Sequence, residues 1–489
     1  MSESYFLFLF FITLISLISC EKLIFVATHF RHGAREPVEL DNNFLDPLKE
    51  KWTNPGELVP SGERMHYILG LRNRLRYITK KYHLLSEQFN PHEILAYSTP
   101  LNRTIMSMAA QLQGLYSPYN TVPKNLTEGQ IKLAIPQVDI QEKEIQEEIT
   151  KLGSYSLPMG MSIIPIHMIP LSEKKVRVIQ FDKCQAKVSE EENKNIEELE
   201  ILKSEINYFN DKYGTILNNF YGHSVDYKYD FWFMYNFCDC LYVDLVSDRS
   251  LTEIKKVILD FGLLKTDCDR IRELNLREHL AGDKERNVAK LESSLMLLEI
   301  LMYMKSRIDI DINGDNEDSQ FQDYSKPKMF LLSSHDTSLA AHEVFLIDTF
   351  NLNMSLFRNP NYCEQLALEV IENDQTESGK NNYKDYIVNY YVDDELIHSV
   401  NFEEFKEKIE KNAWDTEKVN KYCGINDSRT NDNNNKNLNI VFISVLSLLV
   451  IAVIILSSII CVLSTKLKQK NNRQTLTQIP TDYDLYETD

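Results

Sequence analysis

Three short apolar runs constrain the fold of this chain most, because each one ends at charged or nucleophilic side chains. The runs are Leu23–Ala27, Ile94–Tyr97 and Phe330–Leu332. Each has the length and composition of a buried strand, and segments between them, such as 61–83 and 288–308, show the apolar spacing of helices. Strands that alternate with helices predict an α/β fold with an open, mostly parallel sheet and helices on both faces.

The candidate functional residues follow these three runs. The first run leads to Arg31-His32-Gly33-Ala34-Arg35, the second is followed by Arg103, and the third ends at His335-Asp336. In open α/β sheets, ligands bind outside the carboxyl ends of the strands, so we expect these side chains to converge. Taken singly, they have simpler interpretations: Arg103 as a surface helix residue, and Asp336 as a helix cap.

His32 lies between Arg31 and Arg35. A guanidinium is charged at any ordinary pH, so the two arginines should lower the pKa of His32 and keep its imidazole neutral. A neutral imidazole can act as a nucleophile, and the planar guanidinium fork suits a phosphate group. We expect Gly33 to let the chain turn sharply and a ligand approach the backbone.

Two terminal apolar segments predict a type I membrane protein. Residues 1–20 have the pattern of a secretory signal peptide, although no basic residue precedes the apolar stretch. Residues 440–463 are uncharged and long enough to cross a bilayer, and the basic residues that follow place the C-terminus in the cytosol. The predicted order is signal peptide 1–20, ectodomain 21–430 with a helical cap insert at about 186–283, linker 431–439, transmembrane helix 440–463 and cytosolic tail 464–489.

The formal net charge of −19 lies almost entirely on the ectodomain, because the basic and acidic residues of the tail balance. Such a charge argues against nucleic acid as a partner. The predicted topology places the ectodomain in a lysosomal or endosomal lumen or at the cell surface. The sequence leaves the oligomeric state open, with a homodimer as one option.

Eight cysteines are present, and two of them, Cys20 and Cys461, lie in the terminal apolar segments. An even number of the rest, in a secretory context, implies disulfide bonds. No second Cys or His pair lies at zinc-site spacing from Cys238-Asp239-Cys240, so we predict no metal site there. The disulfide candidates are Cys184, Cys238, Cys240, Cys268, Cys363 and Cys423, and the glycosylation sequons begin at Asn125, Asn353 and Asn426.

These motifs together resemble the histidine acid phosphatase family, of the lysosomal and prostatic type. Residues 31–37 match its Arg-His-Gly-x-Arg-x-Pro signature, and His335-Asp336 matches its second signature. Residues 98–104 are similar to its Ser-Thr-x-x-x-Arg-Thr segment, and residues 165–167 to a Pro-x-His turn. The resemblance covers nearly the whole ectodomain. Tyr97 and Asn102 depart from the arginine and aspartate that are common in the family, which affects fine substrate contacts rather than the chemistry.

The resemblance implies hydrolysis of small phosphomonoester substrates through a phosphohistidine on His32, without a cofactor or metal. Arg31, Arg35, Arg103 and His335 would bind the phosphoryl oxygens. Asp336 would protonate the leaving oxygen, which predicts an acidic optimum because Asp336 must be protonated to donate. By similarity, Cys184 would pair with Cys423, and Cys363 with Cys238 or Cys240.

Two other functions are weighed against this one. A phytase or inositol-polyphosphate phosphatase of the same superfamily would need a broadly basic pocket, which the acidic ectodomain disfavours. A non-enzymatic type I receptor built on an inactive phosphatase domain is disfavoured because all six catalytic positions are intact.

Overall fold

The computed structural model describes residues 21–38, 54–118, 125–136, 141–169, 184, 196–246, 260–281, 285–314, 327–373 and 382–424. Contacts divide the chain into two compact units, 1–423 and 424–489. The predicted signal peptide, linker, transmembrane helix and tail lie outside the described residues. Within the described ranges, no helix is long and apolar enough to cross a membrane.

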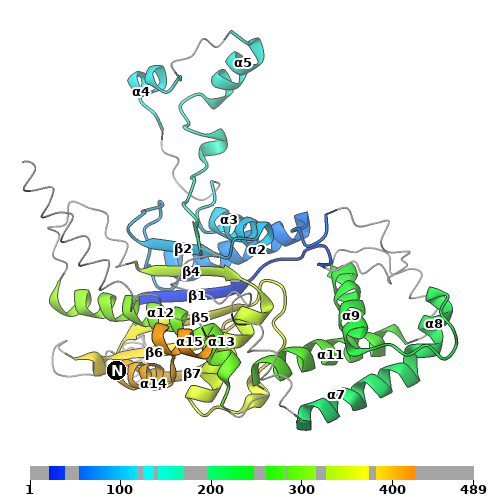
Figure 1. Ribbon diagram of the computed structural model, residues 1–489. Coiled ribbons are helices and arrows are strands. Elements are labelled where there is room, and N and C mark those ends of the chain that lie inside the picture. The colour runs from blue at the N-terminus through cyan, green and yellow to red at the C-terminus, as the bar shows by residue number, and fades with distance from the viewer. Residues whose placement is uncertain are drawn as a thin grey trace, which may run out of the picture. The chain divides into compact units, whose positions relative to one another are not determined.

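One seven-stranded sheet organises the first unit, with strand order β3-β2-β4-β1-β5-β6-β7 (Figure 1). The strands are β1 (Leu23–Arg31), β2 (Ile94–Ser98), β3 (His167–Met168), β4 (Met329–Ser334), β5 (Gln365–Glu372), β6 (Tyr386–Val392) and β7 (Glu395–Asn401). Every residue of β1 and β4 is buried, so these two strands form the centre of the sheet. The three apolar runs of the sequence are therefore strands, as predicted.

The strand directions divide the sheet into two parts. β3, β2, β4 and β1 pair in parallel, whereas β5, β6 and β7 continue as antiparallel neighbours. Because β6 is antiparallel to β5, it runs in the same direction as β1. The prediction of a mostly parallel, open α/β sheet is confirmed, with an antiparallel meander at one edge.

Helices cover both faces of the sheet, as predicted (Figure 1). One apolar cluster joins β1, β4 and β5 to α12, α13 and α14, and a second joins β1, β2 and β4 to α3 and the turn after α2. The helices are α2 (Pro60–Arg74), α3 (Asn102–Leu115), α4 (Glu128–Leu133), α5 (Lys143–Leu152), α7 (Ile196–Phe209), α8 (Thr215–Tyr221), α9 (Phe231–Val246), α11 (Phe261–Ala281), α12 (Asn287–Asn313), α13 (Asp336–Thr349), α14 (Phe402–Asn412) and α15 (Thr416–Tyr422).

The region predicted as a helical cap contains α7, α8, α9 and α11 in its described part. These helices share an aromatic-rich cluster of their own, which includes Phe209, Tyr213 and Phe237. They belong to the same compact unit as the sheet. The ends of the predicted insert, 186–195 and 282–283, lie outside the described residues.

The six described cysteines form two disulfides, and one prediction about them is wrong. Cys184 is bonded to Cys423, as predicted. Cys238 of α9 is bonded to Cys268 of α11, while Cys363 is a free thiol, so the predicted bond from Cys363 to Cys238 or Cys240 is absent. The reason lies in the tertiary structure, because α9 and α11 pack side by side and bury Cys238 against Cys268.

Two of the three predicted glycosylation sites can be placed. Asn125 and Asn353 are exposed, which their modification requires, and Asn426 lies outside the described residues. Glycosylation at all three remains a prediction.

Candidate active site

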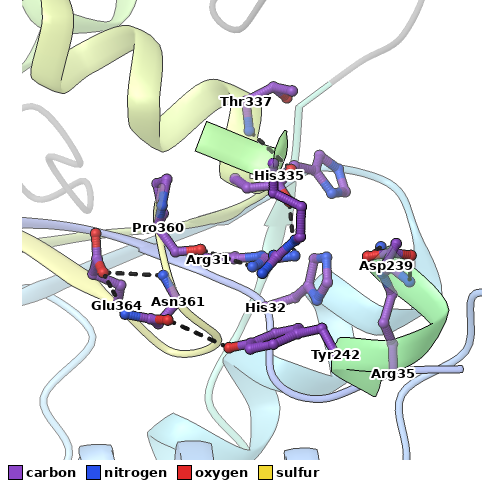
Figure 2. A network of polar contacts seen from close by, with 12 residues as sticks. Arg31, His32, Arg35, Asp239, Tyr242, His335, Thr337, Pro360, Asn361 and Glu364 are labelled. Atoms are coloured by element: carbon purple, nitrogen blue, oxygen red, sulfur yellow. Dashed lines mark hydrogen bonds and ion pairs between the residues drawn. The ribbon is translucent and has the colours of Figure 1, made fainter. Parts of the chain in front are cut away.

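The backbone of the sheet brings the signature residues together. Arg31, the last residue of β1, is in register with Ser334, the last residue of β4. The His32 amide donates to the Ser334 carbonyl at 3.0 Å, and the rings of His32 and His335 have centroids 5.6 Å apart. The predicted convergence at the carboxyl ends of the strands is therefore present (Figure 2).

His32 is buried, with 2% of its surface exposed. Its Nδ1 lies 2.8 Å from the Gly33 carbonyl oxygen. A carbonyl can only accept a hydrogen bond, so Nδ1 carries the proton and Nε2 keeps its lone pair. Burial first, and then Arg31 and Arg35, lower the pKa of His32 well below its ordinary value. The sequence predicted the effect of the arginines, but burial is the larger cause.

The structure gives Gly33 a role that we did not predict, while the predicted sharp turn and ligand approach stay predictions. A Cβ at this position would lie 2.5 Å from the Gly62 carbonyl oxygen, near the start of α2. The residue is glycine because α2 packs directly against the signature turn.

Arg31 is held at both ends of its guanidinium. Nη1 donates to the Pro360 carbonyl at 2.7 Å, and Nη2 forms an ion pair with Asp336 at 2.7 Å. The Tyr362 ring lies 4.3 Å from the Arg31 Cζ. The buried Nε of Arg31 has no hydrogen-bond partner among the residues that the structure describes.

The guanidiniums of Arg35 and Arg103 are also held by acceptors from the protein. Arg35 makes two contacts to the Asp239 carboxylate, at 3.1 and 3.3 Å, and Arg103 contacts the Gly56 carbonyl and the His335 ring at 3.5 and 3.4 Å. Their Nε atoms are likewise buried, with no hydrogen-bond partner in the described ranges. All three guanidiniums therefore lie close enough to His32 to lower its pKa, and their combined positive charge suits an anion of several oxygens.

His335 has both ring nitrogens in contact with the protein. Arg103 can only donate, so Nδ1 of His335 accepts at 3.4 Å, and Nε2 donates to the Thr99 hydroxyl at 3.1 Å. Burial and then Arg103 lower the pKa of His335 to about 3. To donate to a phosphoryl oxygen, His335 must give up its hydrogen bond to Thr99 or carry its proton on Nδ1 instead.

Asp336 begins α13, and its Oδ1 accepts from the Thr337 amide at 2.9 Å. Burial alone would raise the pKa of Asp336, but Arg31 and Arg35 outweigh burial and hold this pKa below its ordinary value. Asp336 is therefore ionised in the ligand-free site and paired with Arg31. The expectation that it is protonated at mildly acidic pH does not hold before substrate binds.

The sequence analysis missed a second group of site residues, which come from the cap helices and a loop. Asp239 and Tyr242 of α9 face the signature turn, because Asp239 binds Arg35 and the Tyr242 ring lies 5.1 Å from that of Tyr362 (Figure 2). The Arg272 Cζ of α11 lies 4.1 Å from the Tyr242 ring. The one available signal was helical spacing, since Asp239 and Tyr242 are three residues apart on one face.

Comparisons with known proteins identify the family of this chain. The family model of the histidine phosphatase superfamily (branch 2) matches residues 22–393. Prostatic acid phosphatase from Homo sapiens is 26% identical over 351 residues, which cover 71% of this chain and 74% of the relative. Lysosomal acid phosphatase from Xenopus laevis is 32% identical over 180 residues, which cover 36% of this chain and 33% of the relative.

Two solved structures share the fold. The phytase from Citrobacter braakii has a TM-score of 0.51 at 15% identity, covering 82% of this chain and 99% of its own. The apo form of Hafnia alvei phytase has a TM-score of 0.50 at 11% identity, covering 83% and 98%. At these identities the likeness concerns the fold alone. From the family match and the acid phosphatase relatives, the chain belongs to branch 2 of the histidine phosphatase superfamily.

Proposed function

We propose that this protein is an acid phosphatase that hydrolyses small phosphate monoesters through a phosphohistidine on His32. One observation carries the proposal: a buried, neutral imidazole whose Nε2 keeps its lone pair lies close to the positive charges of Arg31, Arg35 and Arg103. The names of the curated relatives support the same activity.

In the first step, Nε2 of His32 attacks phosphorus while the bond to the leaving oxygen breaks. Arg31, Arg35 and Arg103 stabilise the charge on the transferring oxygens. The leaving oxygen takes a proton from Asp336. In the second step, water attacks the phosphohistidine, Asp336 accepts a proton from that water, and His32 is released with inorganic phosphate.

Asp336 needs a proton before the first step, although Arg31 keeps it ionised in the free site. A phosphate monoester has a second pKa of about 6, so below that value the substrate enters as a monoanion that carries a proton. Its negative charge also offsets the arginines and raises the pKa of Asp336. Acidic pH favours this route, and His32 stays neutral there because its own pKa is low.

We also propose that the ectodomain is lumenal or extracellular and is anchored by residues 440–463. The sequence carries this part of the proposal, through the apolar segment and the basic residues after it. The names of lysosomal relatives favour the lysosome.

The test is a phosphatase assay on the purified ectodomain, residues 21–430, with an aryl phosphate at pH 5. We expect turnover by the wild type and none by His32→Ala, with both proteins showing the same circular dichroism. Equal turnover by both would overturn the role of His32, and no turnover by a folded wild type would overturn the proposed activity.

A further inference from the structure

A loop that precedes β5 holds Arg31, the first residue of the signature. We call residues 360–364 the bracing loop. The Pro360 carbonyl accepts from Nη1 of Arg31 at 2.7 Å, and the Glu364 carbonyl accepts from the Arg31 amide at 3.1 Å (Figure 2). Both the backbone and the guanidinium of Arg31 thus depend on this loop.

The same loop contacts the proposed nucleophile. The Cys363 amide lies 3.4 Å from the His32 carbonyl and donates to it. The Tyr362 ring lies 5.8 Å from the His32 ring, centroid to centroid, and 4.3 Å from the Arg31 Cζ. A shift of the bracing loop would therefore move both residues.

The side chain of Glu364 closes the bracing loop. Its Oε2 accepts from the amide and from the Nδ2 of Asn361, at 3.0 and 3.4 Å. Asn361 in turn accepts from the hydroxyl of Tyr242 on α9, at 3.4 Å. Glu364 thus connects the loop to the cap helices, and it is 5% exposed.

A second buried carboxyl group, Glu343 of α13, is hydrogen-bonded to Glu364. It is 3% exposed, and its Oε1 has no hydrogen-bond partner within the described part of the chain. Two carboxyl groups can share a hydrogen bond only if one is protonated. Burial raises the pKa of Glu364 to about 7, and burial and then Glu364 raise that of Glu343 well above its ordinary value.

The charges around the pair are mixed. Asp393, at the turn after β6, opposes ionisation of both carboxyl groups, while Arg31 favours it at Glu364 and Arg358 at Glu343. Tyr390 of β6 lies close enough for both carboxyl groups to raise its pKa. None of these groups offsets the electrostatic repulsion that would arise if Glu343 and Glu364 were both ionised.

We propose that Glu343 and Glu364 are positioning residues: a proton-sharing pair behind Arg31 that keeps the bracing loop in place and restricts phosphate binding to acidic pH. The inference rests on the proposed phosphatase function. As the pH rises, the pair becomes negative next to Arg31. This negative charge reduces the positive potential that Arg31 presents to the phosphate group, and it weakens the packing of the loop.

The pH dependence of stability has the same sign. The folded state binds protons at this pair more tightly than the unfolded state, where glutamates titrate near pH 4.3. The contribution of the pair to stability is therefore fully present below that value and is lost as the pH rises through about 7.

The test compares Glu364→Gln with the wild type, because glutamine keeps an oxygen that accepts from Asn361 but cannot ionise. We measure the competitive inhibition constant of inorganic phosphate between pH 5 and pH 8. The affinity of the variant relative to the wild type should rise with pH, by about tenfold for each unit by which phosphate shifts the pKa of the pair. A ratio that does not change with pH overturns the proposal.

A matched control is Glu369→Gln in β5. Glu369 is a fully buried side chain that Arg76 contacts at 2.6 and 2.9 Å, so its substitution should destabilise the protein without removing a contact of the bracing loop. Thermal unfolding of all three proteins from pH 5 to pH 8 needs no turnover. The melting temperature of the wild type should fall more steeply with pH than that of Glu364→Gln. Equal slopes overturn the proton-sharing pair even if the phosphatase assay succeeds, and different slopes support it even if that assay fails.

Discussion

The two sides of the active site are built in different ways. On the sheet side, His32 and His335 follow the adjacent, parallel ends of β1 and β4, and a backbone hydrogen bond at 3.0 Å fixes their separation. On the cap side, Asp239 and Tyr242 reach the site from α9 and depend on side-chain contacts to Arg35 and the bracing loop. We infer that the sheet side carries the chemistry, while the cap side positions Arg35 and the bracing loop.

After the complete loss of turnover expected for His32→Ala, the next largest effect also lies on the sheet side, at Asp336. Asp336→Asn should lower kcat/KM on an alkyl phosphate by about 10²–10⁴-fold, the usual contribution of general acid catalysis, and much less on an aryl phosphate. An alkoxide is a poor leaving group that needs a proton, whereas an activated phenolate does not. Steady-state kinetics on the two substrates measure the difference.

The helix-start role of Asp336 gives the opposite expectation. Its Oδ1 accepts from the Thr337 amide, and asparagine can make the same contact. Small, equal losses on the two substrates would therefore leave Asp336 as a structural residue.

A smaller effect is expected on the cap side, at Asp239. Asp239→Asn removes the negative charge that pairs with Arg35 but keeps one acceptor, so kcat/KM should fall by about tenfold, the low end of what a charged hydrogen bond contributes. Asp211→Asn, just after α7, is the control, because that side chain is 79% exposed and should leave kcat/KM unchanged. If both variants behave alike, α9 is not part of the site.

The same contrast explains what could be predicted from the sequence. Arg31, His32 and His335 follow short apolar strands, and the rules for parallel sheets place such residues together. The partner of Arg35 could not be predicted, because Asp239 lies about 200 residues away and its position depends on how α9 packs. The Cys238–Cys268 bond was missed for the same reason.

The charge state of Asp336 also required the structure. A carboxyl group proposed as a general acid suggests a protonated side chain, but the 2.7 Å contact to Arg31 keeps it ionised. Sequence spacing predicts which residues meet, whereas their protonation depends on distance and burial.

The central claim is a covalent phosphohistidine on His32. Rapid mixing of the ectodomain with ³²P-labelled aryl phosphate at pH 5, followed by quenching under conditions that preserve phosphoramidates, should leave label on the wild type. Asp336→Asn should also be labelled, because an aryl leaving group needs no proton, and His32→Ala should not. Labelled peptide mapping should place the phosphate on His32. Turnover by a wild type that never carries label, or label on His32→Ala, would contradict the account.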